Sequence, residues 1–482
     1  AEAQSAPDRA LRAYEATLAL DPTDARALAA IVDVLEAQAR WPELVSAIRR
    51  RSQAAGSGWQ QRQDLVRIAN IQASFLDAPK DAIATWSEVS SAYGESADVV
   101  DALSELYTRT AAHASLAELL GRAADREDEH LASVRCRLGE TYFKQLADAP
   151  AAVAAYRRAL LADPTNESAR QGLALLADDA GVRAEAIAAL ARSYELADEW
   201  EPLLALLDQR LAIATGEEQV VELLLEAAKL QEGRAGAKHA ALASMCKVIA
   251  LRPFDRRVEA EVQRLSVEAE EPLAAATAFE AAAQAAAGDV DRRAHLLEQA
   301  AVIYDEKLGD HAAALTAYTG ALSCMPRSAR FAEAVVRLGA LAGDGAEDVV
   351  EMTLQTVSEG EPPTGHLRLL AGLQRRAPGR PLFDTLLRLA EREPADLAGL
   401  HEAARIADET VSDAALARSA YESLYERASG LVRRAGKDAD PAIVAVAAAA
   451  VARLVTLYRA AGAAQEEIAI QLEAAKLQLH AD

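Results

Sequence analysis

Aromatic residues are scarce in this sequence, where Phe, Trp and Tyr together make up 4% of the 482 residues. Large rings supply much of the area that a compact core buries, so one globular core of this length is disfavoured. β-Branched residues seldom alternate with polar ones, which leaves little from which to build a sheet. About a quarter of the residues are instead alanine, the strongest helix former. The composition therefore predicts several helical domains or an elongated helical array.

Cysteine is equally rare. The three cysteines, Cys136, Cys246 and Cys324, lie far apart and form no CxxC pair. An odd number without that spacing points to neither a disulfide framework nor a zinc site. We expect reduced, buried thiols and a cytoplasmic protein, or a periplasmic one if a signal sequence has been removed. Neither a cofactor nor a metal ion is expected.

Positive charge is in deficit, with 51 Lys and Arg against 74 Asp and Glu, which gives a net charge of −23. Nucleic acids are bound mainly through phosphate contacts from Lys and Arg, so this balance argues against a nucleic-acid partner. The longest apolar run, 442–452, stops at Arg453 and falls short of the roughly 20 residues that span a bilayer. We therefore expect protein partners and no direct membrane insertion. Arginine far outnumbers lysine, which is typical of a GC-rich bacterial genome.

One pattern recurs along the chain: an alanine, a large side chain four residues later, and a Pro or Gly about eight residues further on. The alanine lets a neighbouring helix approach, the large side chain fills the space beside it, and Pro or Gly ends the helix. The large residues of the six copies are Tyr14, Trp86, Tyr156, Met245, Tyr318 and Tyr421.

The helix before the pattern repeats as well. Leu138, Gly139 and Tyr142, followed by the copy around Tyr156, complete a helix–turn–helix unit that resembles the tetratricopeptide repeat family. The resemblance implies an all-α, right-handed superhelical solenoid of stacked helix–turn–helix hairpins, with about 25 helices. It is good at 131–165, fair at 294–327, partial at 62–94 and 222–254, and covers half a unit at 8–22.

The spacing of the large residues predicts the organisation of the array. Three of the intervals are 70 to 73 residues, about two 34-residue units, so well-matched hairpins alternate with degenerate ones. The 89 residues between Tyr156 and Met245 indicate an additional helix, expected near 182–197. We expect a solenoid over 1–342, degenerate repeats or a hinge with Gly/Pro loops over 343–400, and C-terminal repeats over 401–482. The segment 465–480 is interpreted as a capping helix, with a detachable partner-binding helix as the alternative.

A search for catalytic patterns finds little. None of the eight histidines belongs to an HExxH motif, and no strand precedes a glycine-rich phosphate loop. We expect a non-catalytic scaffold that holds other proteins in a complex. The alternatives are a sensing or regulatory arm of a longer protein, which the half unit at 8–22 favours, and a helical enzyme that uses its groove as a cleft.

The family resemblance also implies where partners bind. In tetratricopeptide folds the first helix of each hairpin lines the groove, and its arginines are expected to pair with acids of the partner. By position in the matched units, the implied groove residues are Arg67, Asn70, Arg137, Glu140, Glu226, Lys229, His295 and Glu298.

Overall fold

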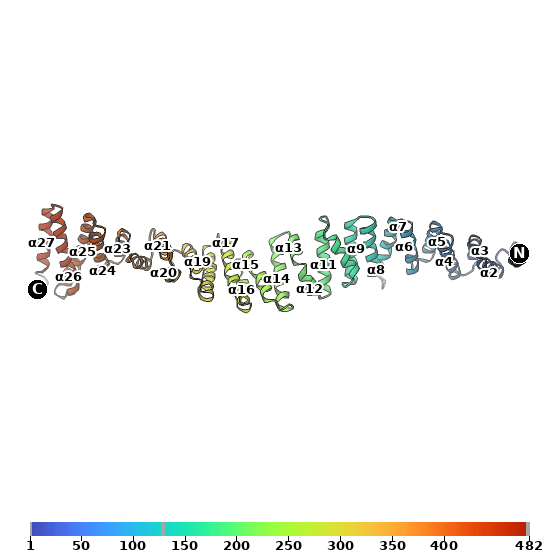
Figure 1. The fold of residues 1–482 in the computed structure, drawn as a ribbon, viewed down its shortest axis with the longest axis horizontal. Helices are drawn as coiled ribbons and strands as arrows, with labels where there is room; N and C mark the ends of the chain where they lie inside the picture. The colour runs from blue at the N-terminus through green and yellow to red at the C-terminus, as the bar shows by residue number, and fades with distance from the viewer. Residues whose placement is uncertain (1, 127–130, 479–482) are drawn as a thin grey trace. The chain divides into compact units, whose positions relative to one another are not determined.

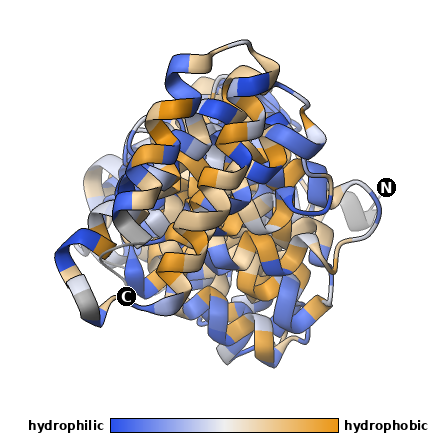
Figure 2. Cartoon of the chain, turned by 90° about the vertical axis from the view of Figure 1, so that its left-hand side faces the viewer, coloured by the Kyte–Doolittle hydropathy of each residue, from blue (hydrophilic) through white to orange (hydrophobic). Residues whose placement is uncertain are grey.

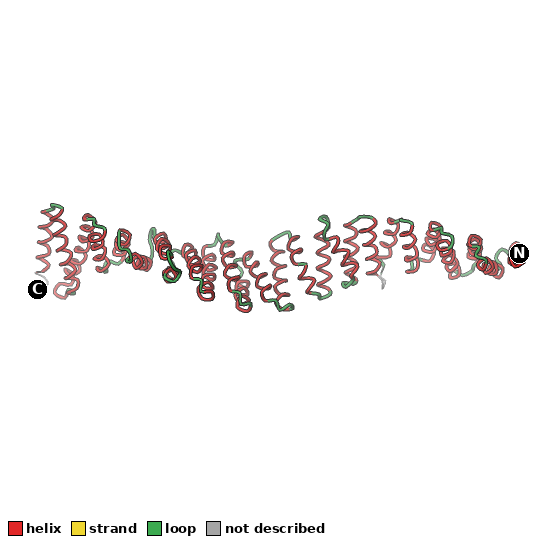
Figure 3. The backbone as a smooth tube through the Cα atoms, in the orientation of Figure 1, coloured by secondary structure: helices red, strands yellow, loops and turns green. Residues whose placement is uncertain are grey.

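The computed structural model describes residues 2–126 and 131–478. Within these ranges the chain forms 27 α-helices joined by short turns, and no strand occurs there (Figure 1 and Figure 3). Within each unit most consecutive helices pack against one another, and each helix mainly contacts its neighbours along the chain. Hydrophobic and hydrophilic residues both occur along the helices (Figure 2), and the buried hydrophobic side chains pack into clusters between helices. The predicted fold class, an all-α array of stacked helix–turn–helix hairpins, is confirmed.

The chain divides into two compact units, residues 1–219 and 220–482. Helix α14 (Glu217–Gly233) begins at the end of the first unit and continues into the second. The first unit contains α1 (Glu2–Leu20), α2 (Ala25–Ala37), α3 (Trp41–Ala54), α4 (Gly58–Ser74), α5 (Pro79–Tyr93), α6 (Ala97–Arg109), α7 (His113–Ala124), α8 (Leu131–Glu140), α9 (Ala149–Ala162), α10 (Glu167–Leu176), α11 (Arg183–Leu196), α12 (Trp200–Ala205) and α13 (Leu207–Ile213).

The second unit continues the same architecture to the last described residue. Its region 343–400, predicted to hold degenerate repeats or a hinge, is also largely helical. The helices are α15 (Lys238–Leu251), α16 (Arg256–Glu268), α17 (Pro272–Ala285), α18 (Val290–Val302), α19 (His311–Cys324), α20 (Ala329–Gly339), α21 (Ala346–Val357), α22 (Thr364–Gln374), α23 (Arg380–Arg392), α24 (Leu397–Arg405), α25 (Ala414–Ala435), α26 (Pro441–Ala460) and α27 (Ala464–Gln478).

A shared turn geometry builds the hairpins. The backbone N–H groups of Asp148 and Asp310 donate across a widened last helical turn to the carbonyls of Tyr142 and Tyr304, both at 2.9 Å. Each aspartate then accepts a bond from a backbone N–H of the following helix and so caps it. A residue with positive φ closes many of these turns, two positions before the next helix. These residues are Ala39, Asp77, Ala111, Ala147, Asp198, Glu270 and Ser412.

The large residues of the repeat pack between helices. Tyr156 is 1% exposed and lies against Gly139 of α8 and Gly172 of α10, where an added methyl carbon would meet its ring. Trp86, Met245, Tyr318 and Tyr421 are also buried, whereas Tyr14 is half-buried. The glycine of the Leu-Gly pair is therefore needed because the tyrosine ring occupies the place of a side chain.

The array is interrupted after α9. The turns before α2 and α10 share an Asp-Pro-Thr sequence in which Asp21 or Asp163 accepts from the backbone N–H two residues on. The turns after α2 and α11 share a left-handed residue, Ala39 or Asp198. Only α2 lies between the first pair of turns, whereas both α10 and α11 lie between the second pair. One additional helix is therefore inserted within 167–196.

Helix α26 requires a correction to the sequence analysis. The apolar run that ended at Arg453 belongs to a 20-residue helix that is long and apolar enough, by length and composition, to cross a membrane. The sequence-based length of the apolar segment is too short because the helix continues past Arg453 and remains apolar on average although it contains two arginines. In this structure α26 packs against α25 and α27 through buried side chains that include Leu454 and Leu457.

Candidate protein-binding grooves

The eight predicted groove residues lie in pairs on four helices, two helices in each unit. In the first unit, Arg67 and Asn70 lie on α4 and Arg137 and Glu140 on α8, with α5 to α7 between them along the stack. In the second unit, Glu226 and Lys229 lie on α14, and His295 and Glu298 lie on α18. Within each unit, the structure therefore places the members of each pair on one helix and the two pairs on separate helices.

The two predicted groove arginines are already paired within the chain. Arg67 contacts Glu36 of α2 at 2.5 Å, and Arg137 contacts Asp101 of α6 at 2.7 Å. Each pair joins the first helix of one hairpin to the first helix of the hairpin before it, α4 to α2 and α8 to α6. An acid of a partner that binds either arginine would compete with this intramolecular carboxylate.

The second unit also has ion pairs between the first helices of successive hairpins, and a histidine takes the place of the arginine in one of them. His295 of α18 contacts Glu259 of α16 at 2.7 Å, and Arg330 of α20 contacts Glu298 of α18 at 2.6 Å. Burial alone would raise the pKa of Glu259, but its bonds to His295 and Arg292 outweigh this effect and lower it. These contacts hold successive helices in register.

The other predicted positions differ among themselves. Glu140 lies 3.6 Å from Lys144, four residues on in the sequence. Glu226 is half-buried, and Asn70 and Lys229 are exposed on their helices.

A cavity lies between α1 and α3, where the sequence predicts no site. It is a groove of about 610 Å³. Leu11 of α1, Ile31 and Leu35 of α2, and Ala47 of α3 supply its apolar lining. Charged side chains complete its walls: Asp8, Arg12 and Glu15 from α1, and Arg40, Glu43 and Arg50 from the side of α3.

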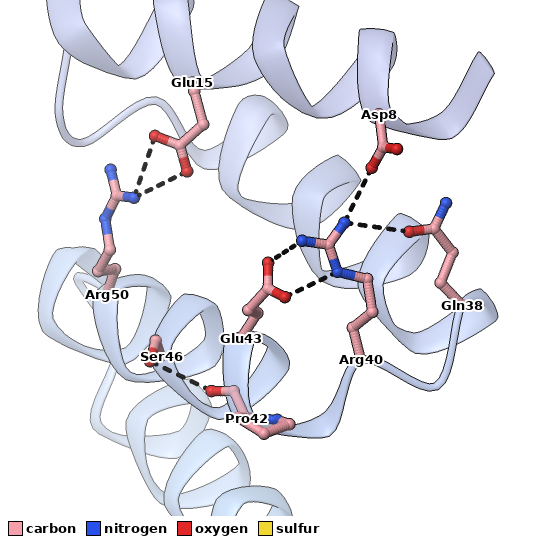
Figure 4. Close-up of polar contacts among 8 residues, drawn as sticks. All are labelled: Asp8, Glu15, Gln38, Arg40, Pro42, Glu43, Ser46 and Arg50. Atoms are coloured by element: carbon pink, nitrogen blue, oxygen red, sulfur yellow. Dashed lines mark hydrogen bonds and ion pairs between the residues drawn. The ribbon is translucent and has the colours of Figure 1, made fainter. Parts of the chain in front are cut away.

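Two ion pairs bridge this groove (Figure 4). The guanidinium of Arg40 donates to Asp8 at 2.9 Å and also binds Glu43 and Gln38. Further along, Arg50 donates to Glu15 at 3.2 Å. The carboxylate of Glu43, followed by that of Asp8, raises the pKa of Arg40, although burial opposes this effect.

Arg12 differs from the other two arginines of this groove. Its Nε donates to the backbone carbonyl of Asp8 at 3.3 Å, and it forms no ion pair within the described part of the chain. Because Arg12 lies on α1 between Asp8 and Glu15, it leaves guanidinium donors free at the middle of the groove. The alternating signs at positions 8, 12 and 15, which share one helix face, are the sequence signal that could have revealed this groove.

Reactive groups do not gather in the regions that the structure describes. There, no three His, Cys, Asp or Glu side chains form a cluster able to hold a metal ion. Burial raises the pKa of both Cys136 and Cys246 to about 11, so these thiols are poor nucleophiles at neutral pH.

No family model and no curated protein matches this chain. Among solved structures, it is similar to one titled as Naa15/Naa10 bound to HypK-THB, at 13% identity and a TM-score of 0.25, covering 93% of this chain and 77% of that one. It is also similar to the C-terminal part of a TPR repeat-containing protein from Cytophaga hutchinsonii, at 14% identity and a TM-score of 0.22, covering 56% and 99%. Both scores are low, so these likenesses add nothing about function.

Proposed function

We propose that the protein is a non-catalytic scaffold that holds segments of protein partners in grooves of its helical array. The observation that supports this proposal most directly is the groove between α1 and α3. It joins an apolar floor to charged walls, which is the composition of surfaces that bind peptide segments or helices. A stacked array of hairpins supplies extended surfaces of this kind.

The charges of the groove define the segment that fits it. An apolar side chain of the partner packs on Leu11, Ile31 and Leu35, and an adjacent carboxylate accepts from Arg12. The ion pairs from Arg40 to Asp8 and from Arg50 to Glu15 lie at the surface, so each contributes little to stability and opens at small cost when a segment enters. The partner is therefore a protein with an apolar and acidic segment.

Photo-crosslinking in the native cells tests this function. A photoreactive residue at position 46, on the wall of the groove, is introduced into the full-length protein, and crosslinked partners are identified by mass spectrometry. We expect a stoichiometric partner whose crosslinked segment carries an acid next to an apolar residue. Arg12→Glu should reduce its yield at least about tenfold, since a charge-assisted contact becomes a repulsive one.

Arg26→Glu is the matched control, because Arg26 is an exposed arginine of α2 outside the groove. Its yield should equal that of the unchanged protein. An equal loss of crosslinking yield in both variants would show that the change in net charge causes the loss. An undiminished yield with Arg12→Glu would refute the role of the groove.

A further inference from the structure

Helix α21, in the second unit, is packed on one side only. Of its 12 residues, Val350 and Leu354 are the buried ones, and they lie four residues apart on one face. On the other side, Val349 is 44% and Met352 is 63% exposed. These two side chains are three residues apart and therefore neighbours on the helix surface. The methionine side chain is flexible and polarisable, which suits a surface that adapts to a partner.

The segment around this helix is strongly acidic. Residues 338–367 contain six Asp and Glu residues and neither Lys nor Arg. Two of the acids are bound within the chain: Glu347 pairs with Arg376, and Glu351 accepts from the side-chain amide of Gln374 at 3.1 Å. Both contacts lie on the side of α21 that faces α22, away from its exposed face.

Two other acids of the segment flank the exposed apolar side chains. Asp348 lies four residues before Met352, on the same side of the helix. Glu359 follows Met352 by seven residues, about two turns, just past the end of α21. Both acids are exposed, and neither forms an ion pair within the described residues. The exposed positions between them, 349, 352, 355 and 356, carry no charge, so this face is apolar with an unpaired carboxylate towards each end.

We propose that this face of α21, defined by Asp348, Val349, Met352 and Glu359, binds a basic, amphipathic helix of a protein partner. Apolar side chains of that helix pack on Val349 and Met352, which are then removed from water. Lys or Arg residues beside them pair with Asp348 and Glu359. The charge selects the occupant, because a segment with acidic flanks would meet two carboxylates that no base within the chain neutralises.

The contact is small. One helix face covers less than a stable interface requires, which is roughly 1,200 Å² or more in total. Binding through α21 alone is therefore weak, and salt screens its charged part. The chemistry is opposite to that of the groove between α1 and α3, for which an acidic segment is proposed. The two surfaces are independent, so either proposal can fail without the other.

Fluorescence anisotropy with two designed peptides and the full-length protein tests the contact. Both peptides are amphipathic helices with Leu along one face, and their remaining positions carry Lys in one peptide and Glu in the other. The Leu/Lys peptide should bind, more weakly as the salt concentration is raised, and the Leu/Glu peptide should not.

Variants of α21 locate the binding of the Leu/Lys peptide. Met352→Ser should weaken it at least about tenfold, because apolar contact is lost without a change in charge. The double change Asp348→Asn and Glu359→Gln should weaken it to a similar extent and also reduce its dependence on salt.

Each variant has a matched control that should bind like the unchanged protein. Leu175→Ser matches Met352→Ser, since Leu175 of α10 is similarly exposed at 60%. The double change Glu105→Gln and Glu118→Gln matches the loss of two charges, since both acids are exposed and lie in the first unit. All of the changed residues are exposed, so the fold should persist, as circular dichroism would verify.

Four results would overturn the proposal. The Leu/Lys peptide could fail to bind, the Leu/Glu peptide could bind equally well, the variants of α21 could leave binding unchanged, or the controls could weaken it as much as those variants do.

Discussion

His366, in the first turn of α22, shows how one buried residue ties stability to pH. Its side chain is fully buried, and neither ring nitrogen has a hydrogen-bond partner. Burial lowers the pKa of His366, and the nearby carbonyl of Ser328 offsets this only in part. The folded chain therefore holds this imidazole neutral.

The prediction at this scale concerns acid stability. Because the pKa of His366 is lower when folded than when unfolded, its contribution is present above about pH 6.5 and is lost as pH falls below that value. Each pH unit below it should cost up to about 1.4 kcal/mol until the folded pKa is reached. The free energy of unfolding in urea, measured at pH 7.5 and 5.5, should fall further for the unchanged protein than for His366→Phe.

The control is His239→Gln, which changes a histidine that is exposed and paired with Glu271. It should retain the pH response of the unchanged protein. Equal losses for His366→Phe and the unchanged protein would show that other groups produce the acid sensitivity.

At the scale of the element, close contacts between helices decide which glycines are required. The helices α8 and α10 both contact the ring of Tyr156 on α9 through a glycine. By contrast, Gly121 of α7 has open space where a Cβ would lie. Glycine is therefore required for packing in α8 and α10. In α7 it only lowers the stability of the helix, since glycine is a poor helix former.

Alanine substitution separates these two cases. Gly139→Ala places a methyl carbon 2.7 Å from Cδ1 of Tyr156 and should destabilise the protein by about 1 to 3 kcal/mol through overpacking. Gly121→Ala should stabilise it by about 0.5 to 1 kcal/mol, because alanine loses less conformational entropy in a helix. Chemical denaturation measures both, and a stabilising Gly139→Ala would contradict the packing of Tyr156 described above.

At the scale of the whole molecule, the chain divides into two compact units, residues 1–219 and 220–482. A stacked array has few contacts between distant parts, so its cooperativity is limited by the contacts from one hairpin to the next. All four tryptophans, Trp41, Trp59, Trp86 and Trp200, belong to the first unit. Tryptophan fluorescence therefore reports on one unit, whereas circular dichroism reports on both.

The two signals should separate during denaturation. We expect the urea transition followed by fluorescence to differ in midpoint or steepness from that followed by far-ultraviolet circular dichroism, because the units unfold as separate cooperative blocks. Coincident transitions by both signals would instead show that the 482 residues unfold as one block.

The sequence by itself determined the helical class, the hairpin unit and its large buried residues. These features depend on local propensity and on a spacing that places Ala and Tyr on one helix face. It did not predict that Arg67 pairs with Glu36, or that a groove lies between α1 and α3. Those contacts join residues about 30 or more positions apart, and they depend on the register and separation of packed helices, which only the tertiary structure decides.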